Sequence, residues 1–364
     1  MSFNKLFRSL STLPHYLDMS ATGLDISDQA IRFIEFSKNK NQLIPIIFGE
    51  KKLPQGLIVS GDITKKDELV SILSSLREEY SMKFVKVSLP EEKAYFFKTE
   101  IPKVYGKEIR QSIEFKLEEN IPLRADESLF EYNILNKNND KKEHWDVGVS
   151  AVPKLVAESY SEILNDSGLT PVAFEVESKA MARSVIKDDG GLSVMVINIK
   201  DDATVIAMVR GGATRFTSVI AIGGNLITEA LCKNFSISFQ GAEKMKEEKL
   251  FVESKESVAI FFSLIGIISE LKDEISKFYT YWLEKNDLSG EYGGKISKII
   301  LCGKDSTIAG LKDYLSQSLK TRVEIGNVWV NAFSTEDYLP EISFSESLNF
   351  ATAIGLALPD VRMH

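Results

Sequence analysis

Two short polar turns between apolar runs are the parts of this sequence best suited to chemistry. The first is Ser27-Asp28-Gln29 within GLDISDQAIRFIEF (23–36), and the second begins at Lys200, between the runs LSVMVINI and TVIAMV. A hairpin turn can direct backbone N–H groups at the oxygens of a phosphate. Each turn taken singly is more typical of an ordinary surface hairpin, so the rest of the chain has to decide between the two interpretations.

Two glycine-led turns stand between a strand-like run and a helix-like run. VIAIGGNLITEAL contains Gly223 and Gly224, and IILCGKDSTIAGLKDYL contains Gly303. A helix that begins at such a turn adds N–H donors and the positive end of its dipole to an anion site. Two facing hairpin turns and a strand-glycine-helix segment would hold a nucleotide between two halves of the protein. The order of these turns along the chain favours that interpretation.

Residue sets for covalent or metal catalysis are not evident in the sequence. The three histidines are His15, His144 and His364, and no nucleophile is patterned with a base. Cys232 and Cys302 are too far apart for a disulfide framework or a zinc spacing, which suits a reducing cytoplasm. The P-loop pattern is missing. We therefore predict no catalytic residues.

Composition limits the class of protein. The 364 residues are 44% hydrophobic and 26% charged, as in a globular protein, and their number favours at least two domains. A net charge of −8 argues against a nucleic-acid partner, because phosphate contacts need a basic surface. No secretory signal is visible, and the most apolar stretch (257–269) is too short to span a bilayer and is expected to be a buried helix.

The elements that position the turns follow from the hydrophobic periodicity. ATGLDIS, AIRFIEFS and LIPIIFGEKKLP predict three strands in a meander, and the region from LSVMVINI to TSVIAIGG repeats that design. Residues 90–168 alternate strand and helix patterns in a β-α-β-β-α order that looks inserted. Phe3, Leu6, Phe7, Leu10 and Leu13 have helical spacing, which indicates either a helix docked on its own protein or an anchor to a membrane or partner.

The order of these segments resembles the actin-like ATPase superfamily, related to FtsA and MreB, and within it the PilM family of type IV pilus assembly. GLDISDQAIRFIEF and INIKDDATVIAMV are similar to the two phosphate hairpins, and IILCGKDSTIAGLKDYL to the adenosine-binding turn. QSIEFKLEENIPL and NFATAIGLAL resemble the PilM-type insert and the closing helix. The resemblance covers nearly the whole chain and implies a two-lobed α/β, actin-like (ribonuclease-H-like) fold with an inserted β-α-β-β-α subdomain.

The resemblance also implies domain limits and a nucleotide site. The first lobe (1A) would comprise 1–85, 171–188 and 331–364, the inserted subdomain (1C) 86–170, and the second lobe (2A/2B) 189–330, with 2B at about 234–290. ATP with Mg²⁺ would lie between the lobes, with Asp25 holding Mg²⁺ through water. The positions that match the family's nucleotide-binding residues are Asp25, Ser27, Arg32, Lys200, Thr204, Gly223, Gly224, Glu243, Lys246 and Gly303.

Departures from the family pattern put catalysis in doubt. Ser27 and Lys200 stand where glycine is usual, Asn198 replaces a second Asp, and Cys302 replaces one glycine of the adenosine turn. Asp28 would place negative charge beside the γ-phosphate. Because phosphoryl transfer depends on the charges around magnesium, we expect ATP hydrolysis to be slow or absent. A nucleotide-free protein and an ATP-Mg²⁺ complex both remain open.

Three functions agree with the resemblance. The first is a cytoplasmic scaffold at the inner membrane, binding the N-terminal cytoplasmic peptide of a PilN-like membrane protein and contacting pilus motor ATPases. The second is an active actin-like ATPase, and the third is an FtsA-like division protein. The chain ends in LALPDVRMH, without the basic helix that FtsA uses to reach the membrane, and the altered hairpins favour the scaffold over the active ATPase.

Overall fold

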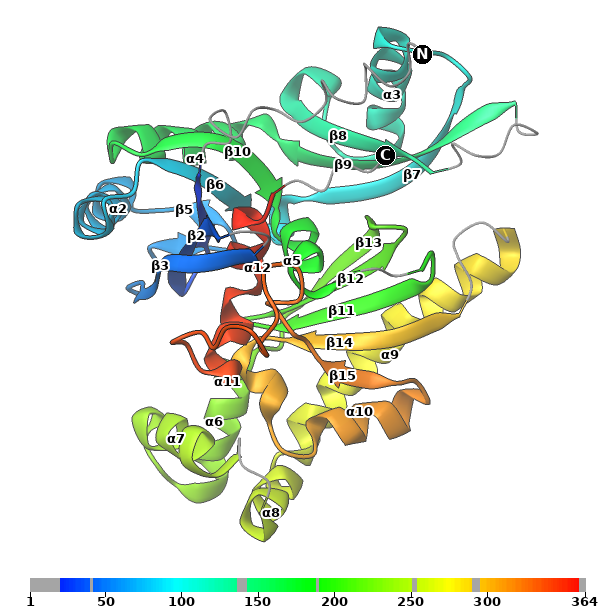
Figure 1. Ribbon diagram of the computed structural model, residues 1–364. Helices are drawn as coiled ribbons and strands as arrows, with labels where there is room; N and C mark the ends of the chain where they lie inside the picture. The colour runs from blue at the N-terminus through cyan, green and yellow to red at the C-terminus, as the bar shows by residue number, and fades with distance from the viewer. Residues whose placement is uncertain are drawn as a thin grey trace.

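The computed structural model describes residues 20–39, 42–135, 143–187, 190–250, 254–289 and 295–359. Within these ranges the chain forms two five-stranded sheets, a three-stranded sheet and a two-stranded hairpin (Figure 1). The N-terminal amphipathic segment, His15 and His364 lie outside the described residues.

The first sheet has the strand order β10-β6-β1-β2-β3. β1 and β2 are antiparallel, β2 and β3 are antiparallel, and β6 lies parallel to both β1 and β10, so the predicted meander is confirmed. α2 covers one face with Leu69, Leu73 and Leu76. The bounds are β1 Thr22–Ile26, β2 Ala30–Asn39, β3 Gln42–Lys52, β6 Phe84–Leu89, β10 Thr170–Val176, α2 Lys66–Tyr80, and the hairpin β4 Ile58–Val59 and β5 Asp62–Ile63.

The second sheet has the order β13-β12-β11-β14-β15 and repeats the arrangement of the first. Its central strand is apolar at every position except Ser193 and Asn198 because helices cover both of its faces. Met195 and Ile197 face α6, α9 and α10, whereas Val194 and Val196 face α5 and α12. The bounds are β11 Ser193–Ile199, β12 Thr204–Arg210, β13 Ala213–Ile220, β14 Ile296–Cys302 and β15 Val323–Ile325.

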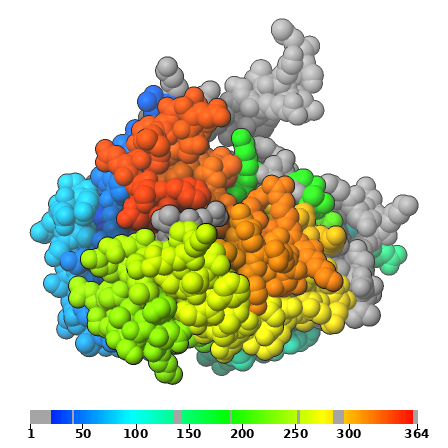
Figure 2. Space-filling model, turned by 90° about the horizontal axis from the view of Figure 1, so that it is seen from below, coloured from blue at the N-terminus to red at the C-terminus, as the bar shows by residue number. Residues whose placement is uncertain are grey.

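The helices from α6 to α10 pack on one face of the second sheet. From below, the chain from α6 to α9 (yellow-green to yellow) lies beside α10 (orange) (Figure 2). The bounds are α5 Glu177–Val185, α6 Gly224–Phe235, α7 Phe239–Met245, α8 Lys255–Ser263, α9 Ile265–Ser289, α10 Leu311–Leu319, α11 Phe344–Ser347 and α12 Ala351–Ala357.

The apolar stretch 257–269 is not the single buried helix that the sequence suggested. It is divided between α8 and α9 at Leu264, and Phe262 and Val258 are exposed. The amphipathic pattern of α8 is weak because only some of its apolar side chains reach the core. No helix within the described ranges has both the length and the apolar character that a bilayer span needs.

The closing helix α12 packs as tightly as its small residues suggested. A Cβ at Gly355 would lie 1.8 Å from the backbone oxygen of Ala180 in α5, and a Cβ at Gly23 would lie 2.0 Å from the backbone oxygen of Ala353. These approaches allow α12 to contact α5 and β1 at backbone distance. Only glycine permits them, because any side chain would force the two elements apart.

The inserted segment forms the three-stranded sheet β7-β9-β8, all antiparallel, with α3 on one face. Ile109, Ile113 and Leu117 of α3 pack on that sheet, as expected. The following helix α4 contributes its buried side chains, including Tyr160 and Ile163, to the core of the first sheet instead. The bounds are β7 Tyr95–Pro102, α3 Lys107–Asn120, β8 Ser128–Ile134, β9 His144–Pro153 and α4 Lys154–Asp166.

Candidate functional site

Asp25 is the second-last residue of β1 and is almost completely buried. Its Oδ1 accepts a hydrogen bond of 2.7 Å from the Ser88 hydroxyl, which in turn accepts the Ile26 N–H at 3.3 Å. Burial raises the pKa of Asp25, while the Ser88 hydrogen bond and the charges of Lys200 and Arg32 oppose that rise. Neighbouring strands therefore fix the position of the carboxylate, and its role toward magnesium stays a prediction.

The first hairpin turn is closed by its own side chains. The Ser27 hydroxyl donates to the Ala30 carbonyl at 2.9 Å and accepts the Ala30 N–H at 3.2 Å. Asp28 accepts the backbone N–H groups of Ser60 and Gly61 at 2.5 and 3.0 Å. The Asp28 charge is thus compensated by a neighbouring turn. This corrects the expectation that it faces a phosphate.

Arg32 connects the two hairpins. Its Nε lies 2.6 Å from Glu50 Oε2, and its Nη2 lies 3.3 Å from Asp201 Oδ2 in the second turn. The guanidinium is buried, and Glu50, Asp201 and Asp25 outweigh that burial and raise its pKa. Arg32 therefore supplies a cation where the family commonly has lysine. Two carboxylates of the protein, Glu50 and Asp201, already bind this cation.

Lys200 is also bound within the protein. Its Nζ lies 3.0 Å from Glu177 Oε2, and the Asn198 amide donates to Glu177 Oε1 at 3.4 Å. Glu92 lies 3.9 Å from the same ammonium. Burial lowers the pKa of Lys200, but these carboxylates raise it well above the usual value. Lys200 therefore neither projects into an open pocket nor offers a free charge to phosphate.

The backbone groups of the second hairpin and of the first turn of α6 form hydrogen bonds with each other. The N–H groups of Gly224 and Asn225 donate to the carbonyls of Lys200 and Asp201 at 2.8 and 2.7 Å. A Cβ at Gly223 would lie 2.5 Å from the nitrogen of Ala203, so glycine allows this close approach. The N–H donors that we expected to face an anion at this helix terminus are used by the hairpin backbone.

Thr204 is at the start of β12 and is fully buried. Its hydroxyl donates to the Ile222 carbonyl at 2.6 Å, which ties the end of the hairpin to the turn before α6. The side chain therefore supports the turn from within the protein.

The side expected to hold ribose and base contains a second buried ion pair. Lys246 Nζ lies 2.9 Å from Asp305 Oδ1 and 3.2 Å from Glu243 Oε1, and it donates to the Thr228 hydroxyl at 3.0 Å. Gly303 begins the adjacent turn with φ +82°, and a Cβ there would lie 2.0 Å from a backbone oxygen of β11. This glycine is required by the backbone conformation as well as by space.

The cavity beside Lys246 and Asp305 is small. A cavity of about 30 Å³ is lined by four carboxylate side chains, two lysines, Ile199 and Asn349. Sites for small molecules and cofactors have volumes of roughly 300–1,000 Å³. A larger cavity of about 450 Å³ lies elsewhere, beside β2, β3 and β6. The residues of the small cavity do not fit ATP with Mg²⁺, because both of its lysines are paired with carboxylates of the protein and four of its eight lining residues are acidic.

The comparison of the sequence with protein families decides the classification. The model of the type IV pilus assembly protein PilM matches residues 23–361. The chain belongs to the PilM family. The match includes both hairpins, the inserted sheet and the closing helix, so membership rests on the whole described architecture.

Solved structures confirm the two-lobed actin-like fold of this PilM-family protein. A chain of the PilM-PilN type IV pilus biogenesis complex is 22% identical, with a TM-score of 0.75 over 93% of this chain and 98% of that one. EutJ of Carboxydothermus hydrogenoformans is 15% identical, with a TM-score of 0.55 over 96% and 92%. MreB5 of Spiroplasma citri bound to ADP is 13% identical, with a TM-score of 0.52 over 93% and 98%.

A shorter sequence match leads to a division protein. Cell division protein FtsA of Neisseria meningitidis serogroup B is 39% identical over 80 residues, which are 22% of this chain and 19% of FtsA. The match spans only about a fifth of that relative, so it supports the actin-like relationship and not a division function. The roles of the nucleotide-site residues stay predictions.

The sequence did not single out the partners that occupy the site. Glu177, Glu50 and Asp305 each bind one of the three buried cations. Glu177 is the first residue of α5, directly after β10, and this junction of a strand with a helix of small residues was the one available signal. Glu50 and Asp305 had none, because their contacts join distant parts of the chain.

Proposed function

We propose that this PilM-family protein is a cytoplasmic scaffold of the type IV pilus assembly machinery, held at the inner membrane by a partner. The partner would be a PilN-like membrane protein whose N-terminal peptide binds beside the inserted sheet. Family membership and the similarity to a chain of the PilM-PilN complex support this proposal. A contact with the pilus motor ATPases stays a prediction.

We infer the peptide site from two edge strands that lie close to each other. Among the described strands, β10 ends the first sheet and β8 ends the inserted sheet. Lys179 of α5 links them, with its Nζ 2.8 Å from Glu131 of β8 and 3.0 Å from Glu175 of β10. Terminal strands offer backbone donors and acceptors that an extended peptide can pair with.

Exposed apolar side chains lie on these two strands and on the neighbouring helix α4. Leu129 of β8, Val172 of β10 and Leu155 of α4 are exposed, although each belongs to a well-packed element. Alternate side chains of an added strand need such apolar contacts for specificity. We therefore assign the peptide to the β8–β10 region, with its backbone along β10.

We propose the three-part domain division with a narrower insert. β6 and α4 pack with the first sheet, whereas the separate core of the insert is built from β7, α3, β8 and β9. The 1C subdomain would then comprise about 95–153, and α4 would belong to the first lobe with the 1A segments. The limits of 2A and 2B remain as the sequence suggested.

The test substitutes exposed residues, because such substitutions leave the packing of the core unchanged. The N-terminal peptide of the PilN-like protein from the same organism is titrated into wild type, Leu129→Glu and Val172→Glu by calorimetry. Each substitution would bury the introduced carboxylate against the peptide, so we expect peptide binding to weaken about tenfold or more. Phe262→Glu in α8 is the control, since Phe262 is also apolar and exposed but distant in the fold. Equal affinity of all four proteins would place the peptide elsewhere.

We also propose that the region between the hairpins acts as a structural lock. The buried pairs Lys200–Glu177 and Lys246–Asp305 and the Arg32–Asp201 contact support this role, because they use the cations that a nucleotide would need. Binding of ATP with Mg²⁺ would require these pairs to separate. If ATP does bind, phosphate would have to replace Glu177 as the partner of Lys200.

A further inference from the structure

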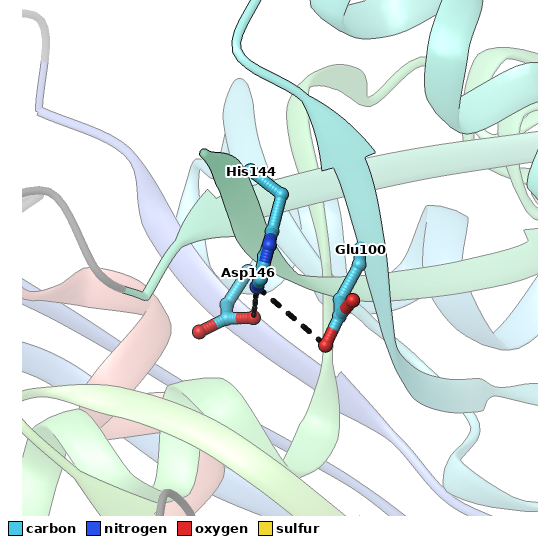
Figure 3. Close-up of side chains that lie close together, drawn as sticks. All are labelled: Glu100, His144 and Asp146. Atoms are coloured by element: carbon cyan, nitrogen blue, oxygen red, sulfur yellow. Dashed lines mark ion pairs between the residues drawn. The ribbon is translucent and has the colours of Figure 1, made fainter. Parts of the chain in front are cut away.

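The inserted sheet carries a cluster of three ligand-type side chains on the face opposite α3. Glu100 of β7 and Asp146 of β9 are directly opposed across the two strands, and His144 precedes Asp146 by two positions on the same face. Figure 3 shows the imidazole pointing between the two carboxylates. Among the described residues, these three were the only group of at least three histidine, cysteine or acidic side chains with such mutual proximity.

The distances within the cluster suit a tetrahedral ion. His144 Nε2 lies 3.6 Å from Glu100 Oε1 and 3.5 Å from Asp146 Oδ1, and all three ligand atoms lie within 4.8 Å of one another. Zinc bonds of about 2.0–2.1 Å at tetrahedral angles place neighbouring ligand atoms about 3.3 Å apart. The histidine therefore needs to move little, and the Glu100 side chain is exposed enough to adjust.

The charges of the cluster favour a cation. Carboxylates that face each other directly across two strands repel, and Asp146 is buried, which strengthens that repulsion. Lys98 lies 3.7 Å from Asp146 Oδ1 and compensates one of the two charges. A divalent cation between the two carboxylates would offset their mutual repulsion.

We propose that Glu100, His144 and Asp146 form a binding site for a divalent transition-metal ion, with zinc as the best match. One imidazole and two carboxylates are ligands that zinc accepts, and three protein ligands leave one position for water. The ion would tie β7 to β9 on the face of the sheet opposite α3. This site is separate from the region between the hairpins and does not depend on the proposed scaffold function.

The test is zinc binding by the whole protein. Zn²⁺ is titrated into metal-free wild type, His144→Ala, Glu100→Gln and the control Glu118→Gln, an exposed carboxylate on the opposite face of the sheet. Wild type and the control are expected to bind one ion with equal affinity, and each ligand variant to bind about tenfold or more weakly. Zinc is also expected to raise the thermal midpoint of wild type and the control only.

Two outcomes would overturn the site. One is the lack of saturable binding by wild type. The other is binding that His144→Ala and Glu100→Gln leave unchanged, which would mean an adventitious ion held elsewhere. Glu100→Gln keeps the test valid if the histidine variant folds poorly, because Glu100 is exposed at the sheet surface. Circular dichroism of each variant without metal shows whether the fold is retained.

Discussion

At the scale of single residues, the polar groups between the hairpins bind one another. Lys200 is paired with Glu177, and both side chains are largely removed from water. Burial raises the pKa of Glu177, and Lys200 is the largest influence against that rise. The charge of each residue is therefore tolerated only because the other is present.

Removing one partner of this pair is expected to destabilise the protein strongly. Lys200→Met leaves the Glu177 carboxylate buried without its cation, a change that costs about 3–5 kcal/mol. The double variant Lys200→Met, Glu177→Gln should recover most of that loss. Urea midpoints measure both effects, with Lys116→Met on exposed α3 as a control near wild type. A urea midpoint of Lys200→Met equal to that of wild type would show that the ion pair does not contribute to stability.

Glu91 gives a pH-dependent prediction. Burial, and next the nearby charge of Glu177, raise the pKa of Glu91 from 4.5 to about 7. The folded state therefore binds this proton more tightly than the unfolded state, and its contribution to stability, complete below pH 4.5, is lost as the pH rises through about 7. The difference in pKa corresponds to about 3 kcal/mol.

Glu91→Gln should remove this dependence. The amide oxygen can still accept the Ser178 N–H that Glu91 accepts at 2.9 Å. Relative to wild type, we expect the variant to gain stability between pH 5 and pH 8, by up to about 3 kcal/mol. Denaturation at several pH values measures the difference, and Glu118→Gln serves as the exposed control. Parallel pH curves for wild type and Glu91→Gln would refute the prediction.

At the scale of elements, α12 packs against α5 and β1 through close backbone contacts. α12 crosses α5 at Gly355, and β1 approaches α12 at Gly23. Both contacts are between backbone atoms, so neighbouring side chains cannot relax to make room for a methyl group. The closing helix is thus positioned by the size of its residues rather than by polar contacts.

Gly355→Ala is expected to destabilise the fold because its methyl group would overlap the Ala180 carbonyl. Overpacking of this kind costs about 1–3 kcal/mol, and more where the backbone has to move. Gly266→Ala in α9 is a matched control, since no atom lies within 4 Å of the added carbon there. The control should equal or exceed wild type in thermal midpoint. If the two variants behaved alike, the contact would not be tight in solution.

At the scale of the whole molecule, the two lobes meet through charges that a nucleotide would compete for. Arg32 and Asp201 join the first hairpin to the second, and the cavity lined by Asp201, Lys246 and Asp305 has a volume of about 30 Å³. An actin-like fold is accordingly combined with a site closed by its own side chains. The fold alone does not imply turnover, because catalysis depends on the site.

ATP turnover is expected to be absent or very slow. Phosphate release from ATP and Mg²⁺ by wild type should not exceed that of heat-inactivated protein, since the cations are paired and Asn198 offers no carboxylate. The Asp25→Ala variant is the control for contamination by another ATPase. Steady release by wild type that Asp25→Ala abolishes would contradict the prediction.

The sequence by itself determined most of the elements and their order, although it did not show the division of 257–269 between α8 and α9. Periodicity located both meanders, the small-residue helix α12 and the apolar face of α3, because local spacing fixes which side of an element is buried. It also located the hairpin turns and the altered residues within them. The tertiary structure alone decided what those residues contact. Glu177 meets Lys200, Glu50 meets Arg32, and α4 joins the first sheet, since each contact joins segments that only the folded chain brings together.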